Sequence, residues 1–315
     1  MDKWIQYGVT ALLFPGSIVN SIIRKKEEQP PAGKMLHTPR GTFHVIEKGQ
    51  GPLTIMMDAG LSGSSLHWHH VQEKLSQHAH TISFDRGGYG WSDRRSGQYD
   101  GKETVKDMTA ILEGLGCTSP LVMVGHSYGG LNVRLFAQEH RKRVKGIVLV
   151  DAVHEERYET EETDRMEAIK KNLRWMKLGY YSAYTGVPRL LKMKVGGRMI
   201  AKEVAHLHSY MAYKPSAYEA VYKELRDSGF TARQVKESTP LHRDLFMTII
   251  QSNNKSPEWL RYQEKLQQLT DHPTVILTDH GHNIHMENPS LVARAVSEQL
   301  KKIDTHILKE ESVRS

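Results

Sequence analysis

A short motif in the first half of the chain contains residues that could do covalent chemistry. Residues 121–130 read LVMVGHSYGG, an apolar run that ends in a Gly-x-Ser-x-Gly sequence centred on Ser127. A strand that turns sharply into a helix at such a sequence holds the serine in a strained conformation with its hydroxyl exposed. Residues 131–139 are typical of a helix, so this context is present and Ser127 is the predicted nucleophile. Without that context, the motif would be only a flexible turn.

Two backbone amides near Ser127 could stabilise negative charge on a substrate oxygen. The N–H of Tyr128 would lie at a helix N-terminus, where unpaired amides and the helix dipole favour an anion. A second donor is expected from the turn after the apolar run at 53–58. Gly60 in that turn permits close approach, and the N–H of Leu61 would point at the same oxygen. Leu61 and Tyr128 are therefore the predicted oxyanion-hole donors.

A serine hydroxyl needs a base that takes its proton, and the base needs an acid that orients it. The chain has 18 histidines, so position along the chain must decide among them. In proteins with this strand–serine–helix motif, the histidine lies in a loop after the last strand. That loop reads DHGHNIH at 279–285. His282 follows a glycine that can turn the loop toward the sheet, so it is the predicted base, with His285 in reserve.

The acid partner of His282 is predicted to be Asp151, although other carboxylates compete with it. The turn after the run at 244–250 is a common place for the acid, but it reads QSNN and contains no carboxylate. Asp151 ends the strand that follows the helix after Ser127, and strand ends at that edge face the site. Its alternative role is a helix N-cap. The fallbacks are Asp244, which precedes its strand, and Asp279, which is only three residues from His282.

The histidines of the 279–285 loop, together with Asp279, could also be interpreted as a metal site. The Ser127 motif already accounts for a histidine in this loop, and no second ligand cluster is evident in the sequence. The run formed by His67, His69 and His70 opens a helix and is interpreted as surface or pocket wall. We therefore expect neither a metal nor a cofactor.

The order of apolar runs predicts the elements that must hold these residues. Short strands are expected within 34–47, and buried strands at 53–58, 80–84, 121–126 and 146–150, alternating with helices at 68–77, 102–115 and 131–139. This alternation predicts an α/β fold with a mostly parallel, doubly wound sheet. The pattern stops at 154–238, which is helical and charged, and resumes at 244–250, 257–269, 274–277 and 289–302. We expect 34–153 and 239–315 to form the core and 154–238 an inserted helical cap over the ligand-binding edge of the sheet.

Composition excludes several classes of protein. The 315 residues include 43 Lys and Arg against 36 Asp and Glu, a net charge of +7 that is spread along the chain. No basic tract is interleaved with aromatic residues, so nucleic-acid binding is not expected. The single cysteine, Cys117, excludes an intrachain disulfide and is expected to be a buried structural thiol.

The N-terminal 33 residues are expected to form an apolar helix followed by a linker, QPPAG at 29–33. Residues 4–23, from Trp4 to Ile23, are largely apolar and are followed by three basic residues. This segment is a candidate membrane anchor, although Pro15 and its polar residues weaken a transmembrane interpretation. The alternative is a helix that lies on the body or at a bilayer surface. A spanning segment would leave the body in the cytoplasm, and the segment is a poor secretory signal.

The motifs together resemble the α/β-hydrolase superfamily over about residues 34–302. The matching sequences are DAGL at 58–61, DRGGYGWS at 85–92, VGHSYGG at 124–130, VLVD at 148–151, and GH at 281–282 followed by MENP at 286–289. They resemble the branch that has its acid after the sixth core strand, which supports Asp151. In that branch a Pro-Pro-x-Gly segment often follows an N-terminal membrane helix. Members usually have His-Gly at the oxyanion turn, where this chain has Ala59-Gly60 and so lacks a side-chain prop.

The resemblance implies a serine hydrolase that needs no cofactor and cleaves a carboxylic ester through an acyl-enzyme. Serine argues against the dehalogenases and epoxide hydrolases of the superfamily, which use aspartate. C–C bond hydrolysis, amidase or aminopeptidase activity, and a non-catalytic ligand-binding relative remain as alternatives. The expected substrate is a small ester with an apolar acyl part. The candidate acyl-pocket residues, most of which are expected instead to pack the cap on the body, are Tyr180, Tyr181, Tyr184, Leu190, Leu191, Met193 and Met199.

Overall fold

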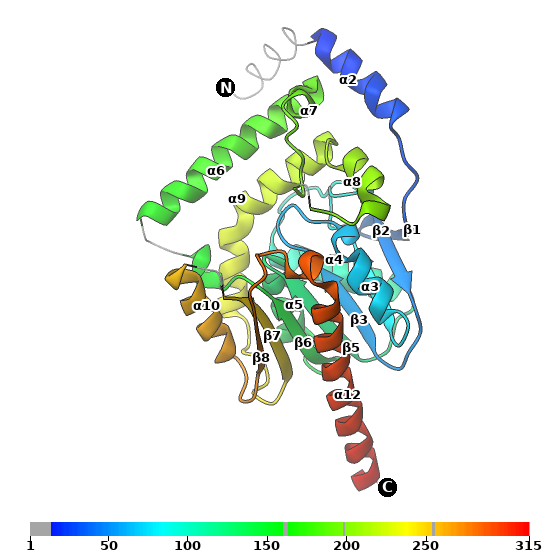
Figure 1. The fold of residues 1–315 in the computed structure, drawn as a ribbon, viewed down its shortest axis with the longest axis vertical. Helices are drawn as coiled ribbons and strands as arrows, with labels where there is room; N and C mark the ends of the chain where they lie inside the picture. The colour runs from blue at the N-terminus through cyan, green and yellow to red at the C-terminus, as the bar shows by residue number, and fades with distance from the viewer. Residues whose placement is uncertain (1–13, 160–162, 198, 254–255, 315) are drawn as a thin grey trace.

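The eight strands in the described part of the chain form one mixed sheet. A computed structural model describes residues 14–159, 163–197, 199–253 and 256–314 (Figure 1). The strand order is β1-β2-β4-β3-β5-β6-β7-β8, in which β2 runs antiparallel to its neighbours β1 and β4 and all other neighbouring strands are parallel. The strands are β1 (Lys34–Thr38), β2 (Gly41–Lys48), β3 (Thr54–Asp58), β4 (His80–Phe84), β5 (Leu121–His126), β6 (Val144–Val150), β7 (Phe246–Ser252) and β8 (Thr274–Thr278).

Helices cover both faces of the sheet because the central strands are apolar on both sides. Ile55 and Met57 of β3 pack toward one face, while Met56 between them packs toward the other, as the two-residue period of a strand requires. The first face is covered by α3 (His69–Leu75) and α12 (Pro289–Arg314). The second face is covered by α4 (Gly101–Gly114), α5 (Gly129–Glu139) and α10 (Pro257–Gln267). The predicted doubly wound α/β fold is therefore confirmed.

A helical insertion lies between β6 and β7, and it contains no strand in its described part. In Figure 1 its helices stand over one end of the sheet, with α6 lying beside α9. The helical insertion that was expected at 154–238 is thus present. Its elements are η2 (Glu155–Arg157), α6 (Thr163–Ser182), η3 (Ala183–Thr185), α7 (Val187–Leu190), η4 (Lys202–Val204), α8 (Ala205–Met211) and α9 (Pro215–Glu237).

Buried ion pairs of Arg86 with Asp58 and Glu224 link α9 to the sheet. The Arg86 side chain, only 3% exposed, donates to Asp58 at the end of β3 (2.6 Å) and to both carboxylate oxygens of Glu224 on α9 (2.7 and 3.0 Å). The hydroxyl of Tyr89 also donates to Glu224 (2.8 Å). Charges this deeply buried are tolerated only when they are paired and hydrogen-bonded, as all three are here.

Replacing Arg86 with methionine should lower the free energy of unfolding by about 3–5 kcal/mol, because Asp58 and Glu224 would remain buried without their counter-ion. Urea denaturation followed by circular dichroism measures the change. The matched control is Arg243→Met, which breaks an exposed pair with Asp271 and should cost less than about 1 kcal/mol. Equal losses in the two variants would contradict a structural role for the buried pair.

The single cysteine differs from its sequence prediction. Cys117 is half-buried in a polar setting rather than buried in the core. Burial alone would raise the pKa of the Cys117 thiol, but hydrogen bonds with polar neighbours, foremost His80, outweigh it and lower the pKa to about 6. A thiol with this pKa is mostly ionised at neutral pH. Because Cys117 is only half-buried, the prediction of a buried thiol is wrong.

The predicted N-terminal anchor falls only partly within the described residues. Helix α2 (Phe14–Lys26) contains the second half of the apolar segment, and residues 4–13 lie outside the described part of the chain. None of the helices in the described ranges has the length and apolar composition needed to span a bilayer. The linker follows, and the indole of Trp91 donates to the carbonyl of Gln29 (3.0 Å), which holds it against the core.

Candidate active site

The turn between β5 and α5 holds Ser127 in a strained backbone conformation. Its φ of +49° lies in the left-handed region that side chains other than glycine rarely adopt. The Ser127 amide donates to the carbonyl of Val150 (3.1 Å), so the turn is tied to the neighbouring strand. A Cβ on Gly129 would lie 2.4 Å from the carbonyl oxygen of Asp58, so only glycine lets α5 begin this close to β3.

The structure brings Ser127, His282 and Asp151 into one hydrogen-bonded chain. The Nε2 atom of His282 lies 2.9 Å from the Ser127 hydroxyl oxygen, and its Nδ1 lies 2.6 Å from a carboxylate oxygen of Asp151. Because a carboxylate accepts hydrogen bonds, Nδ1 carries the ring proton and Nε2 can accept from serine. This is the arrangement of nucleophile, base and orienting acid that acyl transfer requires.

Asp151 is oriented by contacts that the sequence did not reveal. Its second carboxylate oxygen accepts from the indole N–H of Trp259 (3.0 Å) and from the backbone N–H of Ser252 (3.3 Å). The side chain is fully buried, and its backbone φ is +40°. The indole ring of Trp259 also packs edge-on against the His282 ring. Two donors thus occupy one carboxylate oxygen of Asp151 and leave the other for the histidine.

The fallback acids lie elsewhere. Asp279 accepts from the Asn253 side chain (3.3 Å) at the end of β8. Asp244 precedes β7, so it lies at the edge of the sheet where β7 begins. The other end of β7, at Ser252, lies at the opposite edge. Strand β7 also extends through Ser252, further than the predicted run at 244–250, so much of the supposed turn belongs to the strand.

Two buried histidines support the loop that carries His282. The Nε2–H of His126 donates to the backbone carbonyl of His282 (2.9 Å). His285, the reserve base, packs between the rings of His126 (4.1 Å between centroids) and Trp68 (4.6 Å). Burial, together with the charge repulsion between the rings, lowers the pKa of both His126 and His285 well below the usual range. Both rings are therefore neutral near pH 7 and act as a packed support under the loop.

Hydrogen bonds from Arg86 to carbonyl groups of the turn after β3 orient the Leu61 amide of that turn. The guanidinium donates to the carbonyls of Ala59 (2.6 Å) and Gly60 (2.9 Å). In a trans peptide the N–H points away from the C=O, so the Leu61 N–H faces away from Arg86. A Cβ on Gly60 would lie 3.1 Å from the Ser127 Cβ, which shows how closely this turn approaches the serine.

The two predicted oxyanion donors are both available for a ligand. Within the described part of the chain, neither the Leu61 N–H nor the Tyr128 N–H makes a hydrogen bond. Such amides at the start of α5 and in the β3 turn can hold a negative oxygen. Arg86 holds this turn through the carbonyls of Ala59 and Gly60, a contact that sequence reasoning did not find because Arg86 lies more than 25 residues further along.

A cavity of about 130 Å³ lies against the oxyanion turn. Its lining includes three histidines, and of the seven residues predicted to line an acyl pocket it includes only Met199. Tyr184, Leu190, Leu191 and Met193 are instead exposed on the cap surface. These four side chains therefore neither line this cavity nor pack in the core. The lining residues are Gly60, Leu61, Ser62, Gly63, His67, His126, Gly196, Gly197, Met199, Asn283, His285 and Met286.

The histidines that the sequence suggested as metal ligands do not come together in the structure as their spacing in the sequence would suggest. In the described residues, the 279–285 loop does not form a group with ligand-like spacing. Among the described residues, the one group whose donor atoms all lie within 4.8 Å of one another comprises His69, His70 and Glu203, with Glu203 exposed on the cap. His67, at the start of the same helical region, lines the cavity instead, and its Nε2–H donates to the carbonyl of Gly196 (3.1 Å).

Comparisons with known proteins agree with this geometry. A family model described as the alpha/beta hydrolase fold matches residues 55–289. The chain is 30% identical over 129 residues to 2-(acetamidomethylene)succinate hydrolase from Mesorhizobium japonicum, covering 41% of this chain and 45% of that protein. It is 30% identical over 116 residues to epoxide hydrolase 3 from Xenopus tropicalis, covering 36% of this chain and 31% of that protein. The alignments thus span less than half the length of these curated relatives.

Solved structures extend the likeness to nearly the whole chain. A candidate epoxide hydrolase from Pseudomonas aeruginosa, determined as a point mutant, superposes with a TM-score of 0.73 at 15% identity. The superposition covers 88% of this chain and 99% of that one, and at this identity it shows the fold alone. Because the family model matches well over half of the chain, from β3 through the Ser127 turn to the His282 loop, the chain belongs to the alpha/beta hydrolase fold family.

Proposed function

We propose that the protein is a serine hydrolase that cleaves a small carboxylic ester through an acyl-enzyme. The observation that carries this proposal is the hydrogen-bonded chain from the Ser127 hydroxyl through His282 to Asp151, with distances of 2.9 and 2.6 Å. Serine at the nucleophile position favours acyl transfer, since a serine ester is readily hydrolysed by water with the same base.

The reaction follows from the positions of the protons. His282 Nε2 accepts the Ser127 proton as the serine oxygen attacks the ester carbon, and Asp151 stabilises the ring that has become positively charged. The amides of Leu61 and Tyr128 hold the resulting oxyanion. The His282 proton then passes to the leaving alcohol, and the acyl group remains on Ser127. Water, activated by His282, attacks the acyl-enzyme and releases the acid.

The cavity favours a short acyl group. Its volume of about 130 Å³ is close to that of an engineered 150 Å³ protein cavity that binds benzene, so it suits an acyl part of about six heavy atoms or fewer. Histidines contribute to its wall, and burial lowers the pKa of His67, so this ring is neutral. The proposed substrate is therefore a short-chain ester whose acyl part carries no charge.

A series of p-nitrophenyl esters from acetate to laurate tests the proposal. We expect kcat/KM for acetate or butyrate to exceed that for laurate by about tenfold or more, since the additional methylene groups of laurate would not fit in the cavity. Met199→Ala should enlarge the cavity and shift the preference toward longer chains. Met193→Ala, which is exposed and does not line the cavity, is the matched control and should leave the preference unchanged.

The same measurement separates esters from the other reactions of the family. The panel adds an N-terminal-proline amide, an acetamide, a diketone and an epoxide. Faster turnover of one of these than of every ester would replace ester hydrolysis by that reaction. A well-folded protein that turns over none of them and is not labelled at Ser127 by a fluorophosphonate would instead be a ligand-binding relative.

We propose further that the protein works at the cytoplasmic face of a membrane. Supporting this, α2 ends in Arg24, Lys25 and Lys26, the basic flank that favours the cytoplasmic side. Basic residues beside an apolar helix also suit a helix that lies at the bilayer interface. Separating membranes from the soluble fraction of cells that express the full chain tests the location. Recovery only in the soluble fraction would contradict it.

A further inference from the structure

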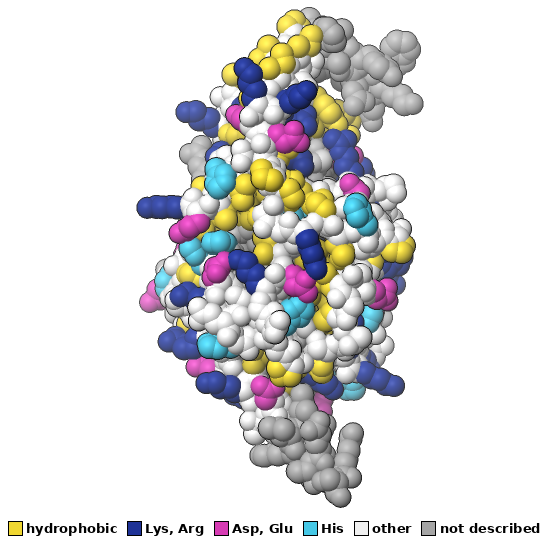
Figure 2. All heavy atoms as spheres, turned by 90° about the vertical axis from the view of Figure 1, so that its right-hand side faces the viewer, with side chains coloured by type: hydrophobic (Ala, Val, Ile, Leu, Met, Phe, Trp, Pro, Cys, Tyr) yellow, Lys and Arg dark blue, Asp and Glu magenta, His cyan; other side chains and the backbone are white. Residues whose placement is uncertain are grey.

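Exposed large hydrophobic side chains are concentrated on α2 and the neighbouring part of the cap. Ten of the thirteen such side chains in the described residues lie there, and we call them the exposed apolar surface. Soluble monomers rarely expose a contiguous set of this kind without a binding role. Figure 2 shows hydrophobic side chains gathered at the α2 end of the molecule among Lys and Arg. The ten are Ile18, Val19, Ile22, Trp175, Leu178, Tyr184, Leu190, Leu191, Met193 and Met199.

Helix α2 packs on the cap with its polar face inward. The buried Asn20 side chain donates to the carbonyls of Ala183 and Tyr184 (both 3.1 Å), and Glu27 pairs with Arg189 of α7 (2.6 Å). A helix on a protein surface ordinarily buries its apolar face and exposes its polar face. Here the reverse holds, because Ile18, Val19 and Ile22 of α2 face outward. Within the described residues, the apolar face of α2 thus stays exposed and could contact a partner.

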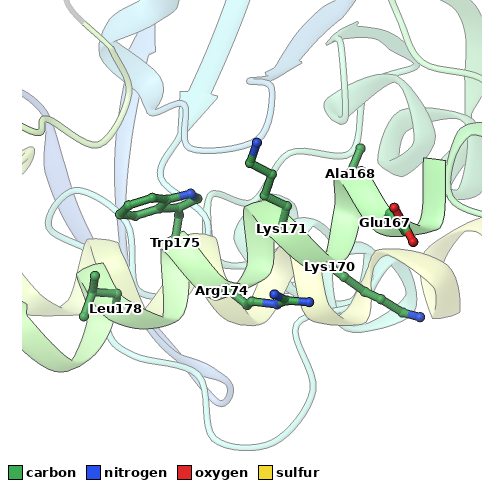
Figure 3. Close-up of a pocket in the computed structure, with 7 residues that line it drawn as sticks. All are labelled: Glu167, Ala168, Lys170, Lys171, Arg174, Trp175 and Leu178. Carbon is green, nitrogen blue, oxygen red and sulfur yellow. The ribbon is translucent and has the colours of Figure 1, made fainter. Parts of the chain in front are cut away.

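The polypeptide that carries most of the exposed apolar surface is also strongly basic. Residues 163–204 contain ten Lys or Arg and three Asp or Glu, so this segment alone carries as much net positive charge as the whole chain. Figure 3 shows Trp175 on α6 with Lys171 and Arg174 beside it, lining a hollow of about 930 Å³. Tryptophan with flanking lysine and arginine is typical of residues at the bilayer interface.

The end of α7 and the loop after it are the most exposed part of this surface. Leu190 is 81% exposed and Leu191 is 64% exposed, and Lys192 turns the chain with a φ of +53°. Apolar side chains that alternate with lysines can enter the interface while the ammonium groups stay among the headgroups. In Figure 1, α2 and α7 lie together at the end of the molecule opposite the C-terminal end of α12. One flat partner could therefore contact both.

We propose that the exposed apolar surface is a docking surface for an anionic phospholipid bilayer. The charge favours lipid over a second copy of the chain, since two copies would oppose their basic segments, whereas phosphatidylserine would pair with them. The inference deepens the proposed membrane location by naming the cap as the contact. The same loop continues into Gly196 and Met199 at the cavity, so docking would bring the proposed active site close to the bilayer.

Flotation of the full chain with vesicles tests the docking surface without any substrate. We expect binding to vesicles of phosphatidylcholine with phosphatidylserine, and much weaker binding to phosphatidylcholine alone or at high salt. The double variant Leu190→Ser/Leu191→Ser should bind at least about tenfold more weakly. The matched control, Val275→Ser/Leu277→Ser, removes exposed side chains from the edge strand β8 and should bind as the wild type does.

Specific results would overturn the proposal. Equal vesicle binding by the two double variants would place the membrane contact elsewhere on the chain, and absence of binding to anionic vesicles would exclude the lipid. A dimer in solution that the Leu190→Ser/Leu191→Ser variant converts to a monomer would show that a second copy covers the surface. Ser127→Ala should bind vesicles as the wild type does, so a failure of the proposed hydrolysis would leave this result untouched.

Discussion

Replacement of Ser127 by alanine should lower kcat for p-nitrophenyl acetate by about 10⁶-fold, the loss typical for removing a serine nucleophile. Alanine deletes the oxygen that lies 2.9 Å from His282 Nε2 and leaves the strained backbone of the turn as it is. The rate that remains would come from the oxyanion donors and binding alone. The same variant should no longer be labelled by a fluorophosphonate, which reacts only with an activated serine.

A second serine provides the control for this experiment. Ser182→Ala removes a hydroxyl that donates to the carbonyl of Leu178 on the cap (2.7 Å), and it should keep both turnover and labelling. Circular dichroism of the two variants should match the wild type. Turnover of the ester by Ser127→Ala at more than a thousandth of the wild-type rate would rule out an acyl-enzyme at this residue.

Replacement of Asp151 by asparagine should lower kcat by about 10⁴-fold while the protein stays folded. The donors Trp259 and Ser252 point at one oxygen of Asp151, so they would hold the amide oxygen of an asparagine there. The amide NH₂ would then face His282 Nδ1, which would have to accept the hydrogen bond. The ring proton would move to Nε2, and His282 could no longer take the proton of Ser127.

The competing carboxylates make this prediction discriminating. Asp279→Asn and Asp244→Asn are the matched variants, and each should change kcat by less than about twofold, because neither touches His282 in the described structure. A large loss in Asp279→Asn with little loss in Asp151→Asn would reverse the assignment. Rates measured with p-nitrophenyl acetate under saturating conditions separate a kcat effect from a change in KM.

Local sequence determined the nucleophile turn and the fold class of this protein. The apolar run before Ser127, the glycines around it and the helix after it are neighbours in the chain, so their pattern contains the information that the turn needs. Continuous apolar runs likewise mark strands buried on both faces, and their alternation with helices indicates a parallel sheet. For these features, sequence separation is short and local preference agrees with the final fold.

Tertiary structure decided what joins distant segments. It selects Asp151 over Asp279 and Asp244 as the partner of His282, because Trp259 and Ser252 orient that carboxylate, and it sets Arg86 behind the oxyanion turn. It also leaves four of the candidate acyl-pocket residues exposed on the cap surface. Apolar residues at 184–193 read alike whether they line a cavity or face outward, since periodicity records which side of a helix is apolar and not what lies opposite it.

The N-terminal helix shows the same limit most clearly. Its sequence contains Asn20 among isoleucines and valines, a pattern that suggests a polar side facing water. In the folded chain the asparagine is buried, because two carbonyl groups of the cap, more than 160 residues away, accept its hydrogen bonds. Sequence alone thus determined the chemistry available at Ser127 and the sheet that holds it. Contacts between distant residues decided which partners complete the site and which surface the molecule leaves exposed.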